Sequence, residues 1–212
     1  MKSKKIKRTL ASILMGAAAS LSLADKVQGQ IISITSVVIN DADQGPPEID
    51  GTNMVWSDNR AADNNLDIYM IDLSTLTQKQ ITSDLSDQLD PDISGDTIVW
   101  THYQSKGNPN GSDIYKATDL DNDPPTISNI SNSIFSQMHP RIYGNVVVWD
   151  SDESGDGLIK YIYKYDITTP GTPPVKISED GVSAENPDIY ENTIVWQQWN
   201  ETDIDIYKLG PQ

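Results

Sequence analysis

The chain alternates short apolar runs with polar turns, and one ten-residue pattern of this kind occurs four times. A proline opens each copy, an isoleucine follows two residues later, and an apolar pair precedes a closing tryptophan. The copies are PEIDGTNMVW at 47–56, PDISGDTIVW at 91–100, PRIYGNVVVW at 140–149 and PDIYENTIVW at 187–196. Successive copies are 44, 49 and 47 residues apart. Self-similarity at a nearly fixed spacing predicts a repeat architecture.

Each repeat carries the signals of four strands. A loop rich in Asn, Asp, Gly and Ser follows the tryptophan and leads to a triplet of apolar and aromatic residues; the triplets are Asp67–Tyr69, Asp113–Tyr115, Tyr161–Tyr163 and Asp205–Tyr207. Two β-prone runs around such a loop predict a hairpin. A second turn and a short run, such as 126–130 or 175–177, supply the other strands. Because no segment shows an apolar stripe with a period of 3.6 residues, we expect almost no helix.

The strand that ends at each tryptophan is apolar on both faces, as in Ile98, Val99 and Trp100. A sheet needs two apolar faces when it is packed between two other sheets. Radially stacked blades meet this requirement and also protect the sheet edges. A linear β-solenoid is the less favoured alternative, because its coils are shorter and need caps.

The number of strands predicts how the ring closes. The fourth repeat stops after Lys208 and lacks its last strand, whereas residues 30–39, QIISITSVVI, resemble that strand. We therefore predict an all-β, four-bladed β-propeller whose N-terminal strand completes the last blade. The expected blades span approximately 46–82, 90–130, 139–178, and 186–208 plus 30–39. A monomer is favoured, and the alternatives are a larger ring made of two chains or a short relative of a larger array.

The repeat resembles that of TolB-type β-propellers. The shared pattern is Pro-x-Ile-x-Gly-x-x-Ile/Val-Val-Trp, a polar loop, Asp-Ile-Tyr-x-x-Asp-Leu and a final Ile-Ser/Thr, and the resemblance covers residues 30–208. The third repeat departs from it at Tyr161, and the fourth at Glu191. The resemblance implies a propeller of the exported or cell-surface type. TolB itself has an extra N-terminal domain and more blades, which we do not expect here, so a role in the Tol-Pal system is not implied.

Residues 1–29 are predicted to be a secretory signal peptide. MKSKKIKR is positively charged, an apolar stretch follows, and Ala24 or Gly29 offers a small residue for cleavage. An anchoring helix is the alternative, but the apolar run is short for a span of about 20 residues. We therefore expect one mature domain over 30–212 that has no membrane span and is secreted, periplasmic or at the cell surface.

Charge and cysteine content remove several classes of function. The formal net charge is −16, with 31 acidic and 15 basic residues. Such a charge repels phosphate backbones, so we expect no nucleic-acid partner. The lack of cysteine excludes disulfides, thiolate zinc sites and a cysteine nucleophile. The sequence also has no Gly-x-Ser-x-Gly elbow, no His-Glu-x-x-His zinc helix and no phosphate-binding glycine loop.

The candidate ligand-binding residues lie in the loops. Three glutamines stand three residues before a repeat proline, where their amides would meet at the mouth of a central channel, although bracing of the loops is the stronger interpretation. Trp199 lies outside the repeat register, which suits contact with a sugar or a peptide. The full candidate set is Gln44, Gln88, Gln137, Arg60, Tyr103, His139 and Trp199.

One acidic loop resembles the opening of a calcium-binding loop. Asp150, Asp152, Ser154 and Asp156 alternate, and Gly155 occupies the sixth position. The match fails later, because Tyr161 stands where the closing carboxylate is needed. A solvated acidic turn is therefore favoured, calcium is the alternative, and no other cofactor is expected.

These observations favour a non-enzymatic binding or scaffold module that recognises a protein or a surface glycan. Two sets of loops, after the tryptophans and before the prolines, are expected to share one face; they are 57–66, 101–112, 150–158 and 197–203, and 40–46, 83–90, 131–139 and 180–186. The alternative is a polysaccharide-acting enzyme, a lyase or a glycosidase, in which several acids converge with a basic residue in a pocket.

Overall fold

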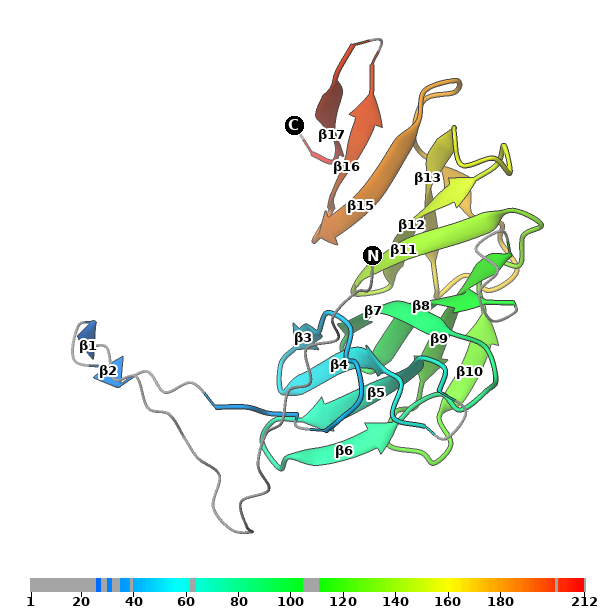
Figure 1. The fold of residues 1–212 in the computed structure, drawn as a ribbon. Coiled ribbons are helices and arrows are strands. Elements are labelled where there is room, and N and C mark those ends of the chain that lie inside the picture. The colour runs from blue at the N-terminus through cyan, green and yellow to red at the C-terminus, as the bar shows by residue number, and fades with distance from the viewer. Residues whose placement is uncertain are drawn as a thin grey trace, which may run out of the picture. The chain divides into compact units, whose positions relative to one another are not determined.

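The computed structural model describes residues 26–27, 30–31, 35–38, 40–61, 64–104, 111–200 and 202–211, and it divides into two compact units, residues 1–39 and 40–212. In the second unit the described elements are all β-strands, and they form four antiparallel sheets that follow one another in chain order (Figure 1). Nowhere in the described part of the chain is there a helix long and apolar enough to cross a membrane. The prediction of an all-β protein is confirmed.

Three sheets have four strands and one has three. The first sheet contains β3(Glu48–Asp50), β4(Asn53–Asp58), β5(Asp67–Asp72) and β6(Thr77–Gln80), and the second contains β7(Gln88–Ser94), β8(Thr97–Tyr103), β9(Ser112–Thr118) and β10(Thr126–Asn129). The third contains β11(Ser136–Tyr143), β12(Val146–Asp152), β13(Lys160–Asp166) and β14(Val175–Lys176), and the fourth β15(Ala184–Tyr190), β16(Thr193–Trp199) and β17(Ile204–Leu209). Each repeat thus folds into one sheet, as its turn signals predict.

The first strand of each later sheet carries a bulge just before the repeat proline. Asp90, His139 and Asn186 occupy this position with φ of 51°, 53° and 54°, and the strand register shifts there. A residue with positive φ that interrupts the ladder re-aims the side chains next to it. In the first repeat this position is Pro46, whose ring fixes φ near −65°. The shorter β3 follows from that residue.

Apolar residues pack between consecutive sheets in a repeating way. In each of the first three sheets, the valine before the tryptophan and the isoleucine of the triplet face the next sheet, whose tryptophan packs against them. The three groups are Val55 and Ile68 with Trp100, Val99 and Ile114 with Trp149, and Val148 and Ile162 with Trp196. These six aliphatic side chains are completely buried. Their burial contributes about 1.5–3 kcal/mol each.

Polar contacts also join the first strands of neighbouring sheets. Asp50 Oδ2 accepts a hydrogen bond of 2.6 Å from Gly95 N, and Ser94 Oγ accepts one of 3.0 Å from Gly144 N. Asp92 accepts from Ile142 N at 2.8 Å and from its own neighbour Ile93 N. These contacts keep β3, β7 and β11 next to one another. We call the first strands of the four sheets, β3, β7, β11 and β15, the inner strands.

The predicted closure of the ring is not confirmed. In the first unit β2(Gln30–Ile31) pairs with β1(Lys26–Val27), and within the described residues β17 is paired only with β16. The other residues of the predicted strand fall partly outside the described ranges, and those at 35–38 are not in a strand. A hairpin between near neighbours closes a much shorter loop than a pairing across the whole chain, so its entropic cost is lower.

Candidate functional site

The inner strands of all four sheets line one cavity. Its volume is about 580 Å³, and its lining comes from β3, β7, β11 and β15. Its charged lining residues are Glu48, Asp50, Asp92, Asp188, Arg141 and His139. Burial raises the pKa of Asp92, against the hydrogen bonds from Ile142 N and Ile93 N that lower it. We call this cavity the inner-strand groove; four carboxylates against one guanidinium and one imidazole give it an acidic character.

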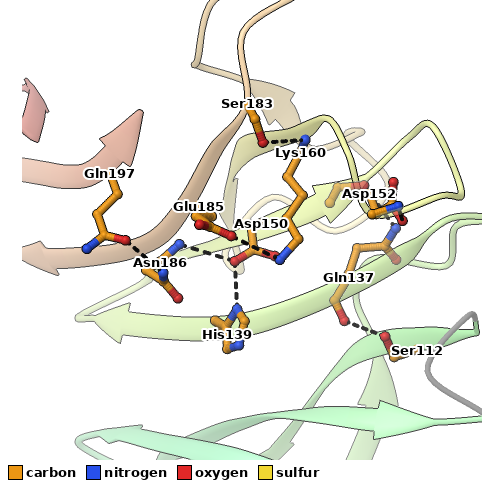
Figure 2. Close-up of polar contacts among 12 residues, drawn as sticks. Ser112, Gln137, His139, Asp150, Asp152, Lys160, Ser183, Glu185, Asn186 and Gln197 are labelled. Atoms are coloured by element: carbon orange, nitrogen blue, oxygen red, sulfur yellow. Dashed lines mark hydrogen bonds and ion pairs between the residues drawn. The ribbon is translucent and has the colours of Figure 1, made fainter. Parts of the chain in front are cut away.

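A buried carboxylate at the edge of the groove connects the third and fourth sheets. Asp150 is only 1% exposed, and its Oδ2 lies 2.7 Å from His139 Nδ1 and accepts a hydrogen bond of 3.2 Å from Asn186 N (Figure 2). Lys160 Nζ lies 3.6 Å from Asp150 Oδ1 and 3.3 Å from Glu185 Oε2. Three groups from three other strands therefore meet around the Asp150 carboxylate, and Glu185 pairs with one of them, Lys160.

The electrostatics of this cluster favour charged side chains. The hydrogen bond to Asp150 raises the pKa of His139, although burial acts in the opposite direction. Burial lowers the pKa of Lys160, but the Asp150 and Glu185 carboxylates outweigh it and the pKa is raised. Lys160, together with His139 when its imidazole is protonated, compensates the buried Asp150, and a buried charge requires such a partner.

Tyr103 belongs to the same neighbourhood. The charges of Asp90 and Lys160 act on the pKa of both Tyr103 and His139. Burial is the largest cause of the raised pKa of Tyr103. Tyr103 and His139 are thus the two predicted ligand-binding residues whose pKa both Asp90 and Lys160 affect.

Arg60 lies on the first sheet. Its Nη2 is 2.5 Å from Asp58 Oδ2, and its guanidinium lies 4.4 Å from the ring centre of Tyr69 and 5.7 Å from that of Trp56. Burial raises the pKa of Asp58, but hydrogen bonds from Arg60, Trp56 and Asn40 outweigh it and lower the pKa to about 2. Arg60 therefore covers an aromatic pair of the first sheet, at a distance from the cluster around Asp150.

The glutamines brace loops. Gln88 is fully buried; its Oε1 accepts from Thr82 Oγ1 at 2.8 Å, and its Nε2 donates to Asp84 Oδ1. Gln137 is also buried and donates to Phe135 O and Ser151 Oγ. Gln44 is exposed and donates to Asn40 Oδ1. Each amide bonds within its own sheet or loop, as the loop-bracing interpretation predicts.

Trp199 lies at the end of β16 and is 47% exposed. It lines a second cavity of about 580 Å³ together with Leu158, Gln198, Asn200 and Tyr207. A half-exposed ring beside amide groups is suited to contact with an incoming ligand.

The acidic loop is organised by its own hydrogen bonds. Asp152 accepts from Ser154 Oγ, Gly155 N and Gly157 N at 2.8–2.9 Å, and Asp156 Oδ1 accepts from Leu158 N at 3.0 Å. Asp150 serves the cluster with His139 instead. In the described part of the chain no group of three or more His, Cys, Asp or Glu residues is placed to hold a metal ion. A solvated acidic turn stays the favoured prediction for this loop, and calcium binding stays the alternative.

Sequence reasoning missed Lys160, Glu185, Asn186 and Asp92. Only Asn186 has a positional signal, because it directly precedes a repeat proline, as His139 does. The residue after the repeat tryptophan, Asp150, pairs with Met138, the neighbour of His139. Had this register been known, Asp150 and His139 would have been recognised as neighbours.

No protein-family model matches the chain, and no curated protein matches it. Solved structures do. TolB from Acinetobacter baumannii superposes with a TM-score of 0.63 at 17% identity, over 83% of this chain and 43% of that one. The Pyrococcus horikoshii acylaminoacyl peptidase gives 0.57 at 14% identity, over 85% of this chain and 27% of that one. A chain of the nidogen/laminin complex gives 0.56 at 13% identity, over 85% and 71%.

At these identities the likeness shows the fold, and the chain spans less than half the length of the TolB and peptidase chains. The repeated sheets, the tryptophan packing between them and the TolB neighbour agree with the resemblance found in the repeat motif. The fold of this chain is that of a TolB-like, propeller-type protein.

Proposed function

We propose that this chain is an exported, non-enzymatic binding module that holds a cationic segment of another protein in its inner-strand groove. One observation carries the proposal: the inner strands of four sheets open onto a single cavity whose lining includes Glu48, Asp50, Asp92 and Asp188. An acidic concave surface attracts and orients a positively charged segment.

The arrangement of the basic groups supports binding over chemistry. His139 and Lys160 are each committed to the buried Asp150 carboxylate, so both serve charge compensation. A general acid or base must reach a substrate proton in a hydrogen-bonding geometry. The polysaccharide-acting alternative predicts release of reducing ends or unsaturated ends from acidic polysaccharides, and the binding proposal predicts neither.

Export from the cytoplasm is part of the same proposal. The basic residues and apolar stretch within 1–29 support export, and the TolB-like fold is compatible with a periplasmic or cell-surface protein. A fusion of residues 1–29 to a reporter that is active only after export tests this step. A reporter that stays inactive would contradict export.

The groove is tested by calorimetric titration with an oligo-arginine peptide of defined length. We expect binding that weakens steeply as salt rises, because exposed charges are screened over about 10 Å at 0.1 M salt. The variant Glu48→Gln/Asp188→Asn should bind about tenfold more weakly, a loss of about 1.4 kcal/mol. The matched control, Asp41→Asn/Asp121→Asn, removes two exposed carboxylates outside the groove and should bind like the wild type.

Equal loss in both variants would mean that the peptide senses only net charge, and would contradict recognition by the groove. A glycan ligand is the second candidate, supported by the exposure of Trp199 in its cavity. In a glycan array it predicts binding that Trp199→Ala abolishes and Glu48→Gln/Asp188→Asn preserves.

A further inference from the structure

The last sheet leaves uncovered the positions that the other sheets bury. Val55, Val99 and Val148 are completely buried, whereas the equivalent Val195 is half-buried. Ile68, Ile114 and Ile162 are completely buried, whereas the equivalent Ile206 is 72% exposed. The strand register places Val195, Ile206 and the 46% exposed Ile204 on the same side of this sheet, together with Asp188 and Lys208. We call these five residues the terminal face.

The opposite end of the stack is largely covered. Trp56, Tyr69 and Ile71 on the first sheet are 2%, 6% and 1% exposed, and Arg60 lies over the two aromatic rings. Only Ile49, on the short inner strand, is 60% exposed there. Repeat proteins are stable when their end units carry a polar cap. The first sheet has such a cap in Arg60, whereas no described residue caps the terminal face in this way.

The charges of the terminal face are self-complementary. Asp188 pairs with Val195 across β15 and β16, and Val195 pairs with Lys208 across β16 and β17, so the three form one row across the sheet. The row has an acid at one end, a base at the other and a valine in the middle. In a chain with a net charge of −16, this row is neutral. A two-fold axis that runs along β16 places each Asp188 opposite a Lys208 and valine opposite valine.

We propose that the terminal face is the interface with a second copy of this chain. The two copies pack their last sheets face to face as sheets do in a β-sandwich, at about 10 Å. In the dimer, the apolar side chains of the terminal face are buried by the partner copy, as Val148 and Ile162 are buried by the fourth sheet. Because the other end of the described stack is largely capped, the described sheets have one such face, and a pair of chains covers both copies of it. This proposal differs from the monomer that the sequence analysis favours.

The test is sedimentation velocity of the purified chain between about 1 and about 100 µM, the range in which an interface of modest size associates. We expect a monomer and dimer in a concentration-dependent equilibrium. Ile206→Asp should abolish the dimer, and the control Leu85→Asp, at a 78% exposed residue in the loop before β7, should leave it intact. Circular dichroism and thermal unfolding establish that each variant is folded.

A charge exchange tests the geometry independently of apolar burial. Asp188→Lys and Lys208→Asp should each weaken the dimer about tenfold, because like charges then face each other. The combined variant Asp188→Lys/Lys208→Asp should restore it. A monomer at all concentrations, or no restoration in the combined variant, would overturn the proposal. A series of larger oligomers would also overturn it, since it would indicate contact between the terminal face and Ile49 of the next chain.

Discussion

The Nδ1 atom of His139 lies 2.7 Å from the Oδ2 atom of the buried Asp150, and this hydrogen bond raises the pKa of His139. A histidine whose pKa is higher in the folded than in the unfolded state stabilises the fold fully below its unfolded pKa, about 6.5. That contribution disappears as pH rises through the folded value. Asp90 acts in the same direction on His139, and burial and Lys160 oppose it.

The first prediction therefore concerns His139→Gln. The difference in unfolding free energy between wild type and variant should be largest near pH 6 and should shrink as pH rises towards 9. Urea unfolding at several pH values measures it. A difference that does not change with pH would show that His139 is not charged by its contact with Asp150.

Two tryptophans provide a matched comparison of burial. Trp100 is 1% exposed between the first two sheets, and Trp199 is 47% exposed. Trp100→Ala should reduce the unfolding free energy by about 3–5 kcal/mol, because it opens a large cavity in the core. Trp199→Ala should change it by less than about 1 kcal/mol. Chemical denaturation measures both, and a loss below 1 kcal/mol for Trp100→Ala would remove that residue from the core.

Acid stability depends on Asp58. Its pKa in the folded state is about 2, below the ordinary value of 3.8, because hydrogen bonds from Arg60 and Trp56 outweigh the effect of burial. Such a carboxylate stabilises the fold above its unfolded pKa and loses this effect as pH falls through the folded value. The wild type should exceed Asp58→Asn in unfolding free energy at pH 5, and the gap should close towards pH 2. Asp121→Asn should show no gap, and a gap that persists at pH 2 would contradict the assignment.

The acidic loop is tested with calcium. Asp152 and Asp156 already accept hydrogen bonds from within the loop, so we expect millimolar calcium to leave the melting temperature unchanged within about 1 °C. Asp152→Asn should lower the melting temperature with or without calcium. A rise of several degrees that calcium causes, that magnesium does not, and that Asp152→Asn removes would establish a calcium site instead.

The sheets could be predicted from the sequence because their signals are local. A tryptophan such as Trp100 lies in an apolar strand, a polar loop follows, and an isoleucine such as Ile114 recurs 10 to 14 residues after each tryptophan. Strand, turn and buried face are therefore all encoded within one repeat. Because every repeat has the same valine, tryptophan and isoleucine positions, the repetition alone predicts which of these residues pack between consecutive sheets. Closure of the ring by residues 30–39 could not be predicted in this way, because it requires pairing between segments at opposite ends of the chain. The short hairpin between Gln30–Ile31 and Lys26–Val27 competes with that pairing.

The candidate site was only partly predictable. His139 and Asp150 were singled out separately, the first as a ligand contact and the second as a calcium ligand, but nothing in the sequence shows that they touch. Their contact depends on the bulge at His139. Lys160 reaches Asp150 from β13, and Glu185 on β15 pairs with Lys160. For the glutamines the sequence showed a recurrence without a shared site, because each glutamine amide forms hydrogen bonds within its own loop or sheet.

Hydrogen–deuterium exchange with the oligo-arginine peptide bound tests the central claim most directly, because it reports where a ligand sits. The account predicts slower exchange at the inner strands, within 48–50, 92–94, 141–143 and 188–190, and little change in the loops that follow the tryptophans. Slower exchange confined to those loops, with the inner strands unchanged, would contradict it.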